Sequence, residues 1–157
     1  SVCEDLAHQL MLNGWSVLTT STNPHRLPRL VDMLNTVWHK RHQYELAQID
    51  VYSGLAFFWA EAVAWALRRA KKPYILTLHG GNLPKFSRRW PYRFKLLLQS
   101  ATAITTPSRY LIEQINLSGS KFWYLPNPLK LSNYTFCERY STQPKLIWLR
   151  AFHDIYN

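Results

Sequence analysis

Apolar residues recur along the chain in two alternating patterns, one typical of helices and one of short strands. Val2, Leu6 and Leu10 recur at helical spacing, and Asn13-Gly14 then favours a left-handed helix end. This spacing predicts helices over residues 2–11, from Pro28 onward, and over 54–71, 91–100 and 108–117. Short apolar runs predict strands over residues 15–20, 47–53, 74–79, 101–106 and 122–125.

Helix and strand therefore alternate five times, with connections of a few residues. This order is typical of a parallel β-sheet covered by helices on both faces. We therefore expect an α/β protein with a Rossmann-like, doubly wound parallel sheet. Such a sheet normally begins with a strand, whereas this chain begins with a helix, so we expect the first and central strand to be missing.

Pro126-Asn127-Pro128 separates the alternating part from a polar stretch that reaches residue 143. Residues 145–149 (KLIWL) then look like a strand that starts another domain. We predict a Rossmann-like domain over residues 1–128, a linker over 129–143 and the start of a truncated second domain over 144–157. The chain also begins at Ser1 without a methionine, so we expect it to be cropped at its amino end.

The composition indicates a folded cytoplasmic domain. With 47% apolar and 15% aromatic residues, 157 residues can fill the core of about one domain. Cys3 and Cys137 are too few for a disulfide framework and fit a reducing compartment. The longest apolar run, residues 55–67, contains Glu61 and falls short of the roughly 20 residues that cross a bilayer, which predicts a buried helix. No signal peptide is visible.

The positive charge is concentrated in one segment. Lys and Arg total 19 against 9 Asp and Glu, which gives a net charge of +10. No acidic residue lies between Glu61 and Glu113, where the basic residues are Arg68, Arg69, Lys71, Lys72, Lys85, Arg88, Arg89, Arg93, Lys95 and Arg109. We therefore expect an anionic partner, whether membrane phosphate, nucleotide or nucleic acid, to meet residues 62–112.

Residues 74–84 (YILTLHGGNLP) place a histidine at a strand end. The predicted strand ends at His79, and Gly80 and Gly81 allow the backbone to approach a ligand closely. His79 could hold a hydroxyl group, or act on it as an acid, a base or an orienting donor. The alternative is a histidine that caps or packs the core edge before a glycine turn. An esterase oxyanion loop is also excluded in its usual form, because no G-x-S-x-G nucleophile elbow occurs.

A second strand end, DVYSG at residues 50–54, opens onto a helix. Local logic favours Ser53 as the N-cap of this helix, although a helix start at the sheet edge also suits a ligand. Neither GxxxxGK[ST] nor GxGxxG occurs, so no phosphate-binding loop is indicated. His39 and His42 have a spacing that could meet a metal, but they lie in a polar run without a carboxylate, which favours a solvated helix end.

Five segments in order resemble bacterial glycosyltransferases of the GT-B fold, family 4 (group 1): DVYSG, KPYILTLHGGNLP, LLLQSATAITTPSRYLIEQI, WYLPNPLKLSNY and PKLIWLRAFHDIYN. The similarity covers essentially the whole chain. These enzymes have two Rossmann-like domains that face a cleft, the first binding mainly the acceptor and the second the nucleotide-sugar donor. The resemblance implies that this chain is the acceptor-side domain with the opening strand of the donor domain, and that it is inactive alone.

The resemblance also implies roles for individual residues. His79 matches a strand-end histidine that is held to be catalytic, and Arg150 a basic residue that meets the donor diphosphate. The positions implied to bind acceptor or substrate are Ser53, Gly54, Gly80, Gly81, Asn82 and Asn127. Many relatives carry a histidine where this chain has Tyr52 or Ser53. The family's amino-terminal glycine-rich loop and its Glu-x7-Glu donor motif are absent from this sequence.

Residues 85–95 (KFSRRWPYRFK) mix basic and aromatic side chains beside the proposed cleft loop. A solvated charged face is the default interpretation, but rings that settle among lipid headgroups while cations meet phosphate favour an anionic membrane. The expected contacts are Arg88, Arg89, Arg93 and Lys95. Several family members reach lipid-linked acceptors through a basic segment of this domain, as the resemblance implies. Single-stranded nucleic acid could use the same residue types but is less favoured, because no nucleic-acid-binding signature appears.

The sequence therefore predicts a glycosyltransferase that moves a sugar from a nucleotide-sugar donor to an acceptor hydroxyl, in polysaccharide, glycolipid or cell-envelope synthesis. Its expected partners are the nucleotide sugar, a sugar or lipid-linked acceptor and its own donor domain. No metal and no further cofactor are expected, and retention of anomeric configuration is implied by the resemblance. We expect it in the cytoplasm, with peripheral attachment to the inner membrane face. The alternative is a non-catalytic basic module that binds anionic membrane or nucleic acid.

Overall fold

The computed structural model describes residues 2–21, 23–115, 122–127, 138 and 141. Ser1–Pro126 form one compact unit, and Asn127–Asn157 are assigned to a second. The predicted strand over residues 145–149 and Arg150 lie outside the described residues, as does nearly all of the predicted linker. The domain boundaries therefore stay predictions.

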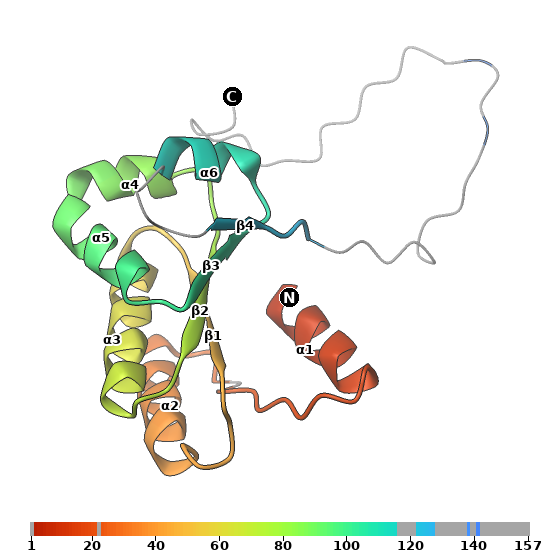
Figure 1. Ribbon diagram of the computed structural model, residues 1–157, viewed down its shortest axis with the longest axis vertical. Helices are drawn as coiled ribbons and strands as arrows, with labels where there is room; N and C mark the ends of the chain where they lie inside the picture. Colours follow the sequence, from red (N-terminus) through yellow and green to blue (C-terminus); the bar gives the residue numbers. More distant parts are fainter. Residues whose placement is uncertain (1, 22, 116–121, 128–137, 139–140, 142–157) are drawn as a thin grey trace. The chain divides into compact units, whose positions relative to one another are not determined.

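Helices and strands alternate along the described part of the chain (Figure 1). The helices are α1 (Val2–Leu12), α2 (Arg26–His39), α3 (Leu55–Arg69), α4 (Leu83–Arg89), α5 (Pro91–Gln99) and α6 (Arg109–Ile115). The strands are β1 (Ala47–Val51), β2 (Tyr74–Leu78), β3 (Ala103–Thr106) and β4 (Phe122–Tyr124). Most elements begin and end within a few residues of the ranges that the apolar spacing predicts.

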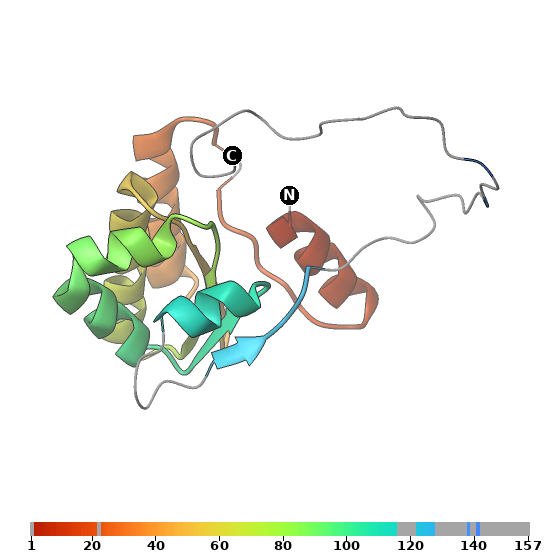
Figure 2. The same cartoon turned by 90° about the horizontal axis from the view of Figure 1, so that it is seen from above.

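The four strands form a parallel sheet in the order β1-β2-β3-β4. This confirms the prediction of an α/β, Rossmann-like fold. Right-handed crossovers between successive neighbours return over the same face of a sheet. Accordingly α3, α4 and α5 lie on one side of the sheet together with α2, and α1 lies on the other side (Figures 1 and 2).

The core lies between α3 and the middle of the sheet. Phe57 of α3 is fully buried, and its ring packs against Phe86 of α4 and Phe94 of α5 with centroids 4.9 and 5.8 Å apart. On the sheet, Leu76 and Leu78 of β2 are fully buried. The apolar run over residues 55–67 is thus a buried helix, as its length and its glutamate predict.

Two sequence-based expectations about secondary structure are wrong. Residues 15–20 form no strand, and Trp15 is 68% exposed. A strand forms only through hydrogen bonds to a neighbouring strand. Among the described residues β1 pairs only with β2, so residues 15–20 have no strand beside them with which to pair. Helix α4 was not expected, because its seven residues are too few to show a clear period. Pro84 in its first turn is the signal that marks its start.

Candidate functional site

The register of the sheet brings Asp50 and His79 together. Asp50 is the penultimate residue of β1 and pairs with Thr77 of β2. His79 follows β2 directly, and its backbone N–H donates to the carbonyl of Val51 at 2.9 Å, which extends the ladder. Side chains alternate along a strand, so Asp50, Thr77 and His79 share one face of the sheet. That face is opposite to the one on which Val51 and Leu78 are buried.

The carboxylate of Asp50 and the ring of His79 form a close, largely buried pair. Asp50 Oδ1 lies 3.5 Å from His79 Nε2, and the two side chains are 16% and 10% exposed. Burial alone raises the pKa of Asp50, but interactions with His79 and Cys3 lower it more, so its pKa lies below the usual value. The carboxylate is therefore charged at neutral pH beside an imidazole that could carry a proton.

Two further side chains complete the surroundings of this pair. The Tyr52 ring stacks on the His79 ring, with centroids 5.0 Å apart and planes 15° from parallel. On the far side of the carboxylate, the Cys3 thiol of α1 donates a hydrogen bond to Asp50 Oδ2. Although part of Cys3 is exposed, burial and this hydrogen bond raise the pKa of the thiol to about 12. Cys3 is thus held as a neutral donor at neutral pH.

Ser53 and Gly54 connect this cluster to α3, but not in the expected way. Gly54 and not Ser53 is the N-cap of α3, and the predicted serine cap is wrong. Gly54 has a φ of +78°, and its carbonyl accepts a hydrogen bond from the Phe57 N–H at 3.2 Å. A positive φ is adopted readily by glycine alone, so the chain turns into the helix one residue later than expected. Ser53 lies between Tyr52 and this turn, half-buried at the sheet edge.

The loop after His79 consists of exposed glycines and the start of α4. Gly80 has a φ of +89°, and its carbonyl accepts from the Leu83 N–H at 3.2 Å. Gly80 and Gly81 are exposed, whereas Asn82 is half-buried and is the N-cap of α4 without a side-chain cap bond. These residues follow His79 directly, as the sequence predicts, so both predicted strand ends meet at one edge of the sheet.

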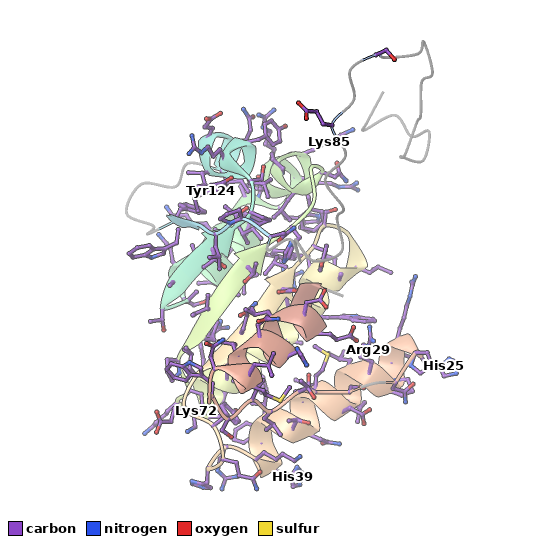
Figure 3. All side chains as sticks on the ribbon, turned by 90° about the vertical axis from the view of Figure 1, so that its right-hand side faces the viewer. His25, Arg29, His39, Lys72, Lys85 and Tyr124 are labelled. Atoms are coloured by element: carbon purple, nitrogen blue, oxygen red, sulfur yellow. The ribbon has the colours of Figure 1, made fainter. Side chains whose placement is uncertain are left out.

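The remaining predicted site residues stay predictions. Asn127 is exposed and belongs to the second unit, and Arg150 lies outside the described residues. Of the two histidines with metal-like spacing, His39 is the last residue of α2 (Figure 3), and His42 is exposed just beyond the helix. His39 is exposed, and its Nδ1 lies 3.0 Å from the carbonyl of Asn35. Within the described ranges no three His, Cys, Asp or Glu side chains gather as a metal-binding group.

The basic residues of α4 and α5 fall into two classes. Arg93 Nε donates to Glu61 Oε1 of α3 at 3.1 Å, and the guanidinium also lies over the Phe58 ring, 4.7 Å from its centroid. Arg88 donates to the side-chain oxygen of Gln114 at 3.2 Å. Arg89 and Lys95 are exposed, as are Arg88 and Arg93. Arg93 therefore links α5 to α3, while 47% of its side chain stays exposed. Its role as an anion contact stays a prediction.

The cluster lies at the carboxyl ends of β1 and β2. In the described part of the chain, one surface hollow lies along α2 and another between α3 and α5, and neither is lined by a residue of the cluster. In the described part of the chain, no helix is both long and apolar enough to cross a bilayer.

Sequence reasoning identified His79 and the glycine loop but missed Asp50, Tyr52 and Cys3 as its neighbours. A charged residue at the penultimate position of a buried strand was the available signal for Asp50. The pairing of Asp50 with His79 needs the strand register, and that of Cys3 needs the position of α1. Neither the strand register nor the position of α1 can be predicted from the local sequence.

Comparison with known proteins gives one match. The chain matches the family model described as Glycosyltransferase Family 4 over residues 4–132. No curated protein and no solved structure matches it. The matched residues include all four strands, and with them Asp50, Tyr52 and His79. Cys3 lies just before the matched range.

Proposed function

Because the chain belongs to glycosyltransferase family 4, we propose that it supplies the acceptor-side half of an enzyme that moves a sugar from a nucleotide-sugar donor to an acceptor hydroxyl. The observation that carries this proposal is the position of His79. It is a largely buried imidazole at the carboxyl end of a parallel strand, which is the edge where ligands bind in open α/β sheets.

The surroundings of His79 support a role in handling a hydroxyl group. An imidazole can accept a hydrogen bond through one nitrogen and donate through the other, and it can exchange a proton near neutral pH. Gly80 and Gly81 carry no side chains that would block a ligand beside the ring, and Ser53 offers a hydroxyl from the neighbouring strand end. His79 is the proposed catalytic residue. Ser53, Gly54, Gly80, Gly81, Asn82 and Asn127 are the proposed substrate-binding positions, with Arg150 at the donor diphosphate.

The test is a transfer assay on the full-length protein that contains this chain. A panel of UDP-, GDP- and ADP-hexoses is supplied with candidate glycan and lipid-linked acceptors, and release of nucleoside diphosphate is measured. We expect His79→Ala to lower the rate on the order of 100-fold or more, because a positioned acid or base contributes that much. His39→Ala, at the exposed end of α2, is the matched control and should keep the wild-type rate. Equal rates for both variants would overturn the assignment of His79.

We also infer that the segment from Trp90 to Leu96 contacts an anionic membrane surface, where a lipid-linked acceptor would lie. Tyr92 is 77% exposed, and Trp90 and Leu96 are exposed as well. Arg89 and Lys95 add exposed positive charge next to them. Exposed rings and aliphatic groups that alternate with cations suit the interface between headgroups and acyl chains.

Vesicle flotation tests this contact. The protein should float with vesicles that contain phosphatidylglycerol and much less with pure phosphatidylcholine. Charge reversal of Arg89 and Lys95 to Glu should abolish flotation. The matched control reverses Arg26 and Arg29 on α2, which changes the net charge equally at another exposed surface. If both double variants lose binding to the same extent, the effect comes from net charge and the proposed surface is wrong.

A further inference from the structure

Asp50 has a buried carboxylate oxygen whose bonding is incomplete. Its Oδ1 is buried and has no hydrogen-bond partner among the described residues. A buried polar atom without a partner destabilises the fold, so a carboxylate in this position needs a physical reason. Nε2 of His79 lies 3.5 Å from this Oδ1.

The backbone fixes this approach. Asp50 pairs with Thr77 in the β1–β2 ladder, and His79 lies two residues further on the same face. The hydrogen bond from the His79 N–H to the Val51 carbonyl keeps the two strand ends in register. Hydrogen bonds around reacting groups are often long in a ligand-free protein and tighten when substrate binds. A distance of 3.5 Å within a fixed register therefore suits an N–H···O bond that closes during the reaction.

The remaining neighbours restrict how the His79 ring can lie. From α1, Cys3 occupies the other carboxylate oxygen, Oδ2, and so directs Oδ1 toward the imidazole. From the loop after β1, Tyr52 covers one face of the imidazole. The carboxylate itself stays charged, since its pKa is lowered below the usual value despite burial. Each element that packs here thus contributes one restraint on the ring or on the carboxylate.

We propose that Asp50 is a positioning residue for His79: it accepts the Nε2 proton and thereby leaves Nδ1 as the nitrogen that meets the substrate hydroxyl. In a neutral imidazole one nitrogen carries the proton and the other accepts, and the hydrogen bond made by one nitrogen sets the state of the other. Asp50 touches no substrate in this scheme and acts only through His79. This inference rests on the proposed function, because it assumes that His79 faces a hydroxyl group.

The first test needs no assay of transfer. In the wild-type chain, the ¹³C signal of the Asp50 carboxyl should respond at the pH at which the His79 ring protons titrate, because the two groups interact directly. In Asp50→Asn, the neutral His79 ring should lose its preference for the proton on Nε2, which is read from its ¹⁵N shifts, because the hydrogen bond made by one ring nitrogen sets the state of the other. Asp32→Asn on α2 is the matched control and should leave the tautomer of His79 unchanged.

These results distinguish positioning from a purely structural role. If the ¹³C signal of Asp50 in the wild-type protein does not change as the His79 ring titrates, the inference is wrong. This outcome does not depend on whether the variant folds. If a folded Asp50→Asn variant keeps the wild-type tautomer at His79, the inference is wrong as well.

The second test uses transfer by the full-length protein. Asp50→Asn should lower kcat about tenfold or more with little change in KM. A loss of rate in His79→Ala without any in Asp50→Asn would reject the inference and keep the proposed function. A rate that depends on neither residue would reject the proposed function, while the titration data would still decide whether Asp50 and His79 are coupled.

Discussion

The hydroxyl of Tyr74 lies 2.7 Å from the Oγ of Ser100, at the opposite end of β2 from His79. Arg68 Nη1 donates to both oxygens, at 3.0 and 2.9 Å. These contacts tie the end of α3 and the start of β2 to the turn between α5 and β3. Tyr74 is almost fully buried, so its hydroxyl depends on these partners for its hydrogen bonds.

Removing this hydroxyl should destabilise the fold measurably. Tyr74→Phe keeps the ring but removes the hydroxyl that Arg68 and Ser100 contact, while Arg68 still donates to Ser100. We expect a loss of about 1–2 kcal/mol, because two hydrogen bonds of a buried network are removed. The measurement is urea unfolding, in which the midpoint should fall without a change in the m value. Tyr110→Phe, on an exposed face of α6, is the control and should leave the midpoint unchanged. Equal midpoints for the two variants would contradict the network.

Gly80 should tolerate substitution less well than its neighbour Gly81. Gly80 has a φ of +89°, and a Cβ built there meets no atom within 4 Å, so the cost is conformational and not steric. We expect Gly80→Ala to lose about 1–2 kcal/mol of stability, the penalty of a left-handed backbone for an L-residue. Gly81 lacks a positive φ, and Gly81→Ala should be close to neutral. Thermal unfolding of both variants checks this difference, and a neutral Gly80→Ala would contradict the described turn.

The stability of the protein should fall in acid partly through Asp50. Its folded-state pKa lies below the ordinary value of 3.8. A carboxyl with a lowered folded pKa stabilises the fold above its unfolded pKa, and this contribution is lost as the pH falls through the folded pKa. Asp50→Asn should therefore lose stability near neutral pH and approach the wild type as the pH falls below the lowered folded-state pKa of Asp50. Urea midpoints between pH 2 and 7 test this, and parallel curves would contradict it.

Cys3 should react slowly with electrophiles. Burial and the hydrogen bond to Asp50 raise its pKa to about 12, and the thiolate is the reacting form. In a Cys137→Ser background, the rate of alkylation by iodoacetamide should keep rising with pH to about 11. Adding Asp50→Asn should move this curve to lower pH, because each unit of lowered pKa raises the thiolate fraction about tenfold. A plateau near pH 9 in the parent protein would show that Cys3 is not held by Asp50.

Much of the fold follows from local pattern. The helical period of α3 and the short apolar runs of β1, β2 and β3 are strong enough to predict each element nearly to its ends. The strand predicted over residues 15–20 fails, since strand formation depends on a pairing partner and not on composition alone. Helix α4 is present but was not predicted, because two helical turns are too short to show a clear apolar period.

The candidate site divides in the same way. The position of His79 at a strand end, followed by Gly80 and Gly81, can be predicted from residue order alone. The N-cap of α3 could not be predicted from the local sequence, because Ser53 and Gly54 both suit a helix start. In the structure the N-cap is Gly54, which has a positive φ. The sequence predicts Arg93 as an anion contact, and only the structure shows that it also forms an ion pair with Glu61 on another helix.

By itself, the sequence determines the class of the protein: the alternation of helices and strands, the histidine and glycines at a strand end, and the segment that carries the excess positive charge. These properties are local, because periodicity and turn chemistry act over a few residues. Only the tertiary structure decided what surrounds His79. Asp50 and His79 are 29 residues apart in the sequence, and Cys3 is further still, so their contacts depend on the parallel register of β1 and β2 and on the packing of α1.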